Sequence, residues 1–470
     1  MSQATSIPEI LKTKTQVAIS NMDIESEVLE PISKTQDRVL FVLPKKGILD
    51  STTRMNIQVL APSANDGFFP INTGIFSTIK TATLRIGTKV IQEIEDVAHY
   101  ITHSRMVRTN EQRKQVDMVL NGILDVVGQD HGNYGRLCVE DAIYDEDGIN
   151  AVVPAKIRPT NSTTTSPTLS VALDDLFGPM LTGLQLPLYL IQAPVSIEIV
   201  FNRQNNVNAD VGKVLCFDSG YSGSKAVSIN LDSVKLLCDF LMYNDDTMRQ
   251  TQNLVNSQNG MVLPFDDIAL TTSNIQASTQ PGTGILPSRF SVVRDIGSAG
   301  KKVKDILIIS KKEGADNLLG VYKSDAHIHP ERYNLRVNDR MIYPRDVSQV
   351  PRMADEVQKV LNGQLYVHNA MYSNMLNSDL LLSVDGNNVQ IMTNTLEGHS
   401  QGSLVGSRHV TGIDLRNMPG GSGIDVGIKN IRYEASIQHS RNDYEARELK
   451  FFVKYQRLLQ LKDGLVEISA

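Results

Sequence analysis

Apolar and polar residues alternate along most of this chain in short runs of four to eight residues, each bounded by Gly, Pro, Asn or Asp. Alternation with a period of two predicts β-strands that bury one face. In the first half the candidates are Val39–Leu43, Met55–Leu60, Thr81–Ile86, Lys89–Glu93, Gly135–Glu140, Thr168–Leu173, Gln185–Ile191, Val195–Phe201 and Ser228–Tyr243. In the second half they are Met261–Phe265, Ile268–Ser273, Arg289–Val293, Asp305–Ser310, Tyr333–Val337, Arg340–Tyr343, Leu380–Val384, Val389–Met392, Gly427–His439, Arg447–Leu461 and Leu465–Ile468.

One strand pair occurs twice in the sequence. Leu84–Ile91 and Leu335–Ile342 have the same apolar and basic residue classes in register. Each copy has two β-forming runs around a dipeptide that tolerates positive φ, Gly-Thr or Asn-Asp, which is typical of a two-residue β-hairpin. The repeat therefore indicates two similar units.

The ends of the two halves support this duplication. Val234–Tyr243 and Leu449–Tyr455 are both long strand candidates, with charge on one face and bulky apolar groups on the other. Helix formers over Asp245–Asn256, with Asn244 as a cap, predict a short connecting helix, and apolar spacing over Met353–Leu361 predicts another.

The chain is long enough for two such units. A length of 470 residues gives a prior of about two to three domains. We expect an all-β protein with about eight strands in each unit, folded as a sandwich or a barrel-like pair of sheets. The expected organisation is a mobile or partner-ordered arm over residues 1–30, a first unit over 31–247 that ends in the linker helix, and a second unit over 248–470.

Composition excludes several classes of protein. Three scattered cysteines, Cys138, Cys216 and Cys238, give no disulfide framework or CxxC metal clamp. A formal net charge of −6 does not supply the basic field of a non-specific nucleic-acid binder. The most apolar stretch, Met180–Phe201, is interrupted by Gly, Pro and Glu, so we expect no membrane-spanning segment.

Short motifs suggest no catalytic residue. Gly297–Lys302 is similar to a phosphate-binding loop, but Asp295 stands where the spacing requires Gly, and Lys302 where it requires Ser or Thr. Ser222–Lys225 has a Ser-x-x-Lys spacing within a Gly/Ser-rich turn, and Asp145–Gly148 begins like a calcium loop without its later ligands. We therefore expect no catalytic, cofactor-binding or metal-binding residues.

Four stretches in order along the chain resemble the double jelly-roll major capsid proteins of double-stranded DNA viruses, in particular those of virophages, polinton-like viruses and the larger eukaryotic DNA viruses. They are Gly47–Asp50, Gly74–Gly87, Leu186–Ile199 and Lys454–Leu458.

This resemblance implies two tandem eight-stranded antiparallel jelly rolls with short connecting helices. It further implies a structural protein, not an enzyme, whose homotrimers form pseudo-hexameric capsomers in an icosahedral virion assembled inside the host cell. The implied partners are further copies of the chain and minor capsid and penton proteins, with no sequence-specific nucleic-acid binding. The N-terminal arm could underlie the shell and reach a minor capsid protein.

One alternative remains open at this point, a bicupin-like metalloenzyme. His327 and His329 share a face if they lie on a strand, and two imidazoles could there bind one metal ion. In bicupins a carboxylate follows later than Glu331 does here. The candidates for a third histidine are His368, His399, His409 and His439.

Overall fold

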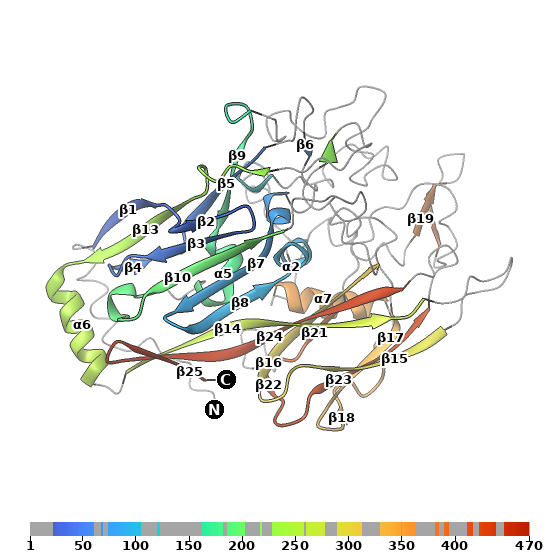
Figure 1. Ribbon diagram of the computed structural model, residues 1–470. Coiled ribbons are helices and arrows are strands. Elements are labelled where there is room, and N and C mark those ends of the chain that lie inside the picture. Colours follow the sequence, from blue (N-terminus) through green and yellow to red (C-terminus); the bar gives the residue numbers. More distant parts are fainter. Residues whose placement is uncertain are drawn as a thin grey trace.

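The computed structural model describes most strands of both halves. The described residues are 22–60, 67–68, 74–104, 120–122, 162–181, 186–202, 217–218, 228–257, 260–277, 289–312, 330–348, 350–362, 381–384, 390–393, 411–416, 423–438 and 446–469. Figure 1 shows them as two sheet sandwiches side by side, the first in blue to green and the second in yellow to red.

The first sandwich consists of two antiparallel sheets. One has the order β1-β13-β5, with β9 and β12 also paired to β5 and β4 paired to β13, and the other has the order β2-β3-β10-β7-β8. The bounds are β1 Met22–Leu29, β2 Ser33–Lys34, β3 Arg38–Leu43, β4 Ile48–Leu49, β5 Arg54–Leu60, β7 Ile79–Ile86, β8 Lys89–Glu95, β9 Thr168–Ala172, β10 Val195–Phe201, β12 Ser228–Ile229 and β13 Lys235–Tyr243. A separate short pair joins β6, Gly67–Phe68, to β11, Phe217–Asp218.

The second sandwich has the same plan. One sheet has the order β14-β24-β16-β21, with β22 paired to β16 and β25 to β24, and the other has the order β15-β23-β17-β18. The bounds are β14 Met261–Ile275, β15 Arg289–Ile296, β16 Lys302–Lys312, β17 Pro330–Val337, β18 Arg340–Met341, β21 Thr411–Asp414, β22 Ile424–Asp425, β23 Ile431–Gln438, β24 Arg447–Lys462 and β25 Leu465–Ser469. A separate hairpin joins β19, Leu381–Val384, to β20, Gln390–Thr393.

The winding order is identical in the two sandwiches. The principal strands in chain order are β1, β3, β5, β7, β8, β9, β10 and β13 in the first, and β14, β15, β16, β17, β18, β21, β23 and β24 in the second. In each, one sheet takes the first, eighth, third and sixth strands and the other takes the second, seventh, fourth and fifth. This is the order of a jelly roll, so the expected tandem jelly rolls are confirmed, and we call them roll 1 and roll 2.

The duplicated sequence forms the same hairpin in both rolls. It joins β7 to β8 in roll 1, where Ile86 pairs with Lys89, and β17 to β18 in roll 2, where Val337 pairs with Arg340. The turn residue Gly87 has φ +59°, and Asn338 and Asp339 have φ +51° and +65°. These positive φ values confirm the two-residue turns that were expected from the Gly-Thr and Asn-Asp dipeptides.

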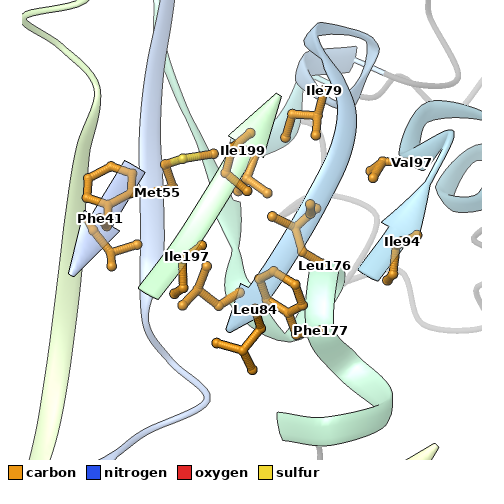
Figure 2. Close-up of a cluster of buried hydrophobic side chains, with 14 of the residues drawn as sticks. Phe41, Met55, Ile79, Leu84, Ile94, Val97, Leu176, Phe177, Ile197 and Ile199 are labelled. Carbon is orange, nitrogen blue, oxygen red and sulfur yellow. The ribbon is translucent and has the colours of Figure 1, made fainter. Parts of the chain in front are cut away.

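Each roll has a core built by strand alternation. On β10 the side chains of Val195, Ile197, Ile199 and Phe201 are buried, while those between them are partly exposed. Figure 2 shows Ile197 and Ile199 among the inward-facing residues of roll 1. The core of roll 2 is lined by aromatic residues, with the Tyr433 ring centroid 5.6 Å from that of Phe451.

Two helices were predicted and two were missed. The linker helix α6 spans Asp245–Ser257, and the backbone N–H of Thr247 donates to Asn244 Oδ1 at 2.8 Å, which confirms the cap. The second predicted helix is α7, Val350–Asn362. The missed helices are α2, Val97–Ser104, which follows β8, and α5, Leu173–Leu181, which follows β9.

Three expectations need correction. Residues 22–29, expected within the N-terminal arm, form β1 because they pair along their whole length with β13; residues 1–21 lie outside the described part. Within the strand expected over Gln185–Ile191, Leu188–Leu190 form a 3-10 turn after Pro187. Thr411–Asp414, where no strand was expected, form β21 on β16. The division at 247/248 falls inside α6 and stays a prediction.

Candidate functional site

The junction between the two rolls combines polar and apolar contacts. Strand β8, the edge of its sheet in roll 1, lies beside β14, the edge of its sheet in roll 2 (Figure 1). Helix α5 also contacts β14. Since both edge strands are covered by the other roll, the junction removes two free sheet edges that could otherwise pair with other chains.

Apolar side chains of roll 2 continue the core of roll 1 across this junction. On β14, β24 and β16, the side chains of Leu270, Phe452 and Leu307 lie in one row across three neighbouring strands. Phe452 and Leu307 are almost fully buried and belong to the same hydrophobic cluster as the interior of roll 1. The ring of Tyr100 from α2 packs on Phe452 with centroids 5.4 Å apart. The core of roll 1 therefore extends onto the outer face of a roll 2 sheet, while roll 2 keeps a separate core of its own.

The hairpin of roll 1 is tied to the end of roll 2 by hydrogen bonds. Lys89 Nζ donates to the carbonyl of Val466 at 2.6 Å, and a guanidinium nitrogen of Arg457 donates to the carbonyl of Ile91 at 3.0 Å. Without these bonds, the two carbonyl groups at the edges of strands β8 and β25 would have only water as a hydrogen-bond donor. They fix the position of the hairpin on roll 2.

Arg457 is itself held by a buried carboxylate. Asp267 on β14 is 4% exposed, and its Oδ2 accepts from Arg457 and from the hydroxyl of Tyr455, each at 2.8 Å. Burial, followed by the charge of Asp267, raises the pKa of Tyr455, so this hydroxyl stays a donor at physiological pH. The triad orients the guanidinium toward Ile91.

An ion pair between the two rolls lies next to α2. The Asp96 carboxylate contacts both the His99 imidazole and the ammonium group of Lys450 on β24. Burial by itself would raise the pKa of Asp96, but the charge and hydrogen bond of His99, together with those of Lys450, hold it below its ordinary value. Asp96 has φ +56°, which lets the chain turn directly from β8 into α2.

A third buried carboxylate has a different character. Asp305 on β16 is 4% exposed, and its Oδ2 has no hydrogen-bond partner among the described residues. Burial raises the pKa of Asp305 to about 6, and the nearby charges of Lys454 and Arg416 only partly oppose this. The charge of Asp305 in turn raises the pKa of Lys454.

These groups form structural ion pairs and hydrogen bonds. The described residues contain no group of three or more His, Cys, Asp or Glu side chains placed to hold a metal ion. Burial raises the pKa of the Cys238 thiol to about 12, so it is not a thiolate nucleophile at neutral pH. Gly297–Lys302 lies in the turn from β15 to β16, where a phosphate loop would join a strand to a helix.

The remaining sequence candidates lie outside the described residues. These are Asp145–Gly148, Ser222–Lys225 and the histidines of the bicupin alternative, His327, His329, His368, His399, His409 and His439. Glu331 is on β17, but its side chain is not described. Within the described part of the chain, no helix has the length and apolar character needed to cross a membrane.

Sequence reasoning missed the junction residues. Lys450 and Asp96 are 354 positions apart, and in the sequence neither differs from a charged residue on a solvent-exposed strand or turn. The one available signal was an interruption of the alternation over Leu449–Tyr455, where the two large apolar residues Phe451 and Phe452 are adjacent. Two neighbouring large apolar residues on a strand indicate burial of both faces, and here each face does pack on a different core.

Comparison with solved structures identifies the fold. A chain of the Sputnik virophage, determined by cryo-EM, is 12% identical, covers 96% of this chain and 88% of its own length, and has a TM-score of 0.61. The chain has a double jelly-roll fold. PBCV-1 VP54, fitted into a reconstruction of the Sputnik virophage, matches at 11% identity with 96% and 97% coverage and a TM-score of 0.57.

The double jelly roll is also found in the Faustovirus major capsid protein, with 10% identity, 94% coverage of this chain, 90% of that chain and a TM-score of 0.51. No protein-family model matches the sequence, and no curated protein matches it. The resemblance inferred from the sequence is therefore supported at the level of the fold, across nearly the whole chain.

Proposed function

We propose that this chain is the major coat subunit of an icosahedral double-stranded DNA virus and has no enzymatic activity. The observation that carries the proposal is the repetition of one winding order in two rolls that pack against each other through buried apolar side chains. Three such two-roll chains around a threefold axis place six similar rolls in a ring. A trimer then has the nearly hexagonal outline needed to tile a closed shell.

The solved structures support this proposal. The Faustovirus relative in fold is a major capsid protein, and another match is a chain in the quasi-atomic capsid of PBCV-1, with a TM-score of 0.56. The proposed location is accordingly the capsid shell of a virion. The proposed partners are further copies of the chain and, at the edges and vertices of the shell, minor capsid and penton proteins.

The expressed full-length chain tests the proposal. We expect native mass spectrometry to give a mass three times the 51.9 kDa of the chain and negative-stain images to show hexagonal particles. Obligate interfaces of this kind bury about 2,000–5,000 Å², so trimers should persist on dilution. A stable monomer over the whole concentration range, or metal bound in stoichiometric amount with enzymatic turnover, would contradict it.

A further inference from the structure

The junction inside the chain indicates how one copy contacts the next. In roll 1 the hairpin strand β8 is covered by the first-strand side of roll 2. Roll 2 has the same hairpin, in which Arg340 and Met341 correspond to Lys89 and Val90. Whereas Lys89 bonds to Val466 across the junction, Arg340 and Met341 lie in the exposed β18, with Met341 43% exposed.

The complementary face is exposed on roll 1. In roll 2 the row that packs across the junction is Leu270–Phe452–Leu307 on β14, β24 and β16. The corresponding strands of roll 1 are β1, β13 and β5, where pairing places Val28 beside Leu237. Leu237 in turn pairs with Arg54.

Two apolar residues of strand β1 face solvent, whereas Leu29 at its end packs against the core of roll 1. Ile24 and Val28 are 63% and 56% exposed, and Leu237 beside Val28 is 37% exposed. Ser26, between them, donates to Asp239 at 2.6 Å on this same face. Glu25 and Glu27 lie on the opposite face, where both pair with Lys46. We call Ile24, Val28 and Leu237 the β1 face.

An outward apolar face on a strand otherwise rich in acidic residues is the reverse of the usual pattern for a solvated edge. It suits a surface that becomes buried in an assembly.

Both surfaces are bordered by charged side chains, of which Glu30 pairs with Lys235 and Arg332 with Asp346 within the chain. Asp23 and Glu30 are exposed at the two ends of β1. Around β18, Arg340 and Arg345 are exposed, and Arg332 is exposed at 63% of its side chain. Opposite charges at the rim of an apolar contact favour one docking orientation over others. We call Arg340 and Met341 the β18 edge.

We propose that the β18 edge of one copy packs on the β1 face of the next, in a head-to-tail contact that repeats the internal junction between the rolls. The inference rests on the proposed trimer and specifies its interface. Because the two surfaces are on different rolls, each copy offers one of each, and three contacts close a ring.

Two single substitutions test the contact. Val28→Asp places a charge in the β1 face, and Met341→Asp places a charge in the β18 edge. Because both positions are exposed, each variant should fold. Each variant alone is expected to be monomeric by native mass spectrometry at concentrations where the unmodified chain is trimeric. Loss of a central apolar anchor raises a dissociation constant by about tenfold or more.

Mixing the two variants tests whether the β18 edge docks on the β1 face and not on another surface. Val28→Asp keeps its β18 edge and Met341→Asp keeps its β1 face, so one productive contact remains. With one variant isotope-labelled, we expect a one-to-one heterodimer and no trimer. The matched control is Val293→Asp on β15, an apolar strand residue 48% exposed at the far edge of the same sheet, which should stay trimeric.

Four results would overturn the inference. If either variant still forms trimers, the contact between copies lies elsewhere. If both variants are monomeric and form no heterodimer on mixing, the β18 edge does not dock on the β1 face. Neither result contradicts the trimer of the unmodified chain. Loss of trimers in Val293→Asp would show that any exposed apolar position has this effect. A monomeric unmodified chain would instead remove the proposed function, and the inference with it.

Discussion

At the scale of single residues, the junction contains charged groups whose burial has opposite consequences. Asp96 is paired across the junction with Lys450, and its pKa is lowered. Asp305 lies on the neighbouring strand with an unpaired oxygen among the described residues, and its pKa is raised. Ionised Asp96 therefore stabilises the fold, whereas ionised Asp305 destabilises it.

We predict that Asp305→Asn stabilises the protein at neutral pH. The pKa of Asp305 is about 6 in the folded chain, against an ordinary value of 3.8 that we take for the unfolded chain. The folded state therefore binds the proton more tightly. The ionisation penalty is fully present above pH 6 and disappears as the pH falls through 6 toward 3.8. At pH 7.5 the variant should gain about 1–3 kcal/mol in free energy of unfolding.

Denaturant unfolding of both proteins at pH 7.5 and pH 4.5 measures this effect. The gain should shrink at the lower pH because wild-type Asp305 is then mostly neutral. Asp295→Asn, on an exposed ion pair with Arg432, is the matched control and should change stability by less than about 1 kcal/mol at either pH. An equal gain at both pH values for Asp305→Asn would show that ionisation is not the cause.

At the scale of elements, helix α7 is positioned by a glycine on β21. A Cβ at Gly412 would lie 2.6 Å from the Cα of Val357, so the helix backbone approaches the strand more closely than any side chain allows. Glu356 on the same helix accepts from the hydroxyl of Tyr343 at 2.8 Å. Close packing and a buried hydrogen bond together fix α7 on roll 2.

We predict that Gly412→Ala destabilises the protein by about 1–3 kcal/mol, because backbone must shift to admit the methyl group. Thermal unfolding measures the change. Gly297→Ala is the control, since its Cβ would meet only the side-chain oxygen of Thr271 at 3.1 Å, and rotation of that side chain loses one exposed hydrogen bond from the Gly297 N–H without moving backbone. Equal effects of the two substitutions would contradict the close approach.

The sequence predicted elements better than contacts between them. The hairpin repeat, the closing strands β13 and β24, and helices α6 and α7 followed from local patterns. Strand β1 was missed because Ile24 and Val28 face outward while acidic residues alternate with them, so the sequence carries no signal of a buried face. The pair of Asp96 and Lys450 could not be predicted, since no local pattern relates a turn in one roll to a strand in the other.

At the scale of the whole molecule, the apolar contact between the rolls predicts that both rolls unfold together. Phe452 and Leu307 are buried against roll 1, so unfolding either roll exposes apolar surface of the other. We expect one calorimetric transition. In a chain with Cys138 and Cys216 replaced by Ser, labelling of buried Cys238 in roll 1 should begin at the temperature of that transition. Two separate transitions, or labelling well below the main one, would contradict coupling.

The two hairpins Leu84–Ile91 and Leu335–Ile342 are encoded at different places in one gene. A mutation in the first changes only the contact within the chain, and one in the second leaves that contact as it was. In a shell protein with a single roll, by contrast, every such mutation would alter all neighbours at once. With the proposed docking between copies, duplication therefore lets substitutions adjust the joint within the chain and the contact between chains independently.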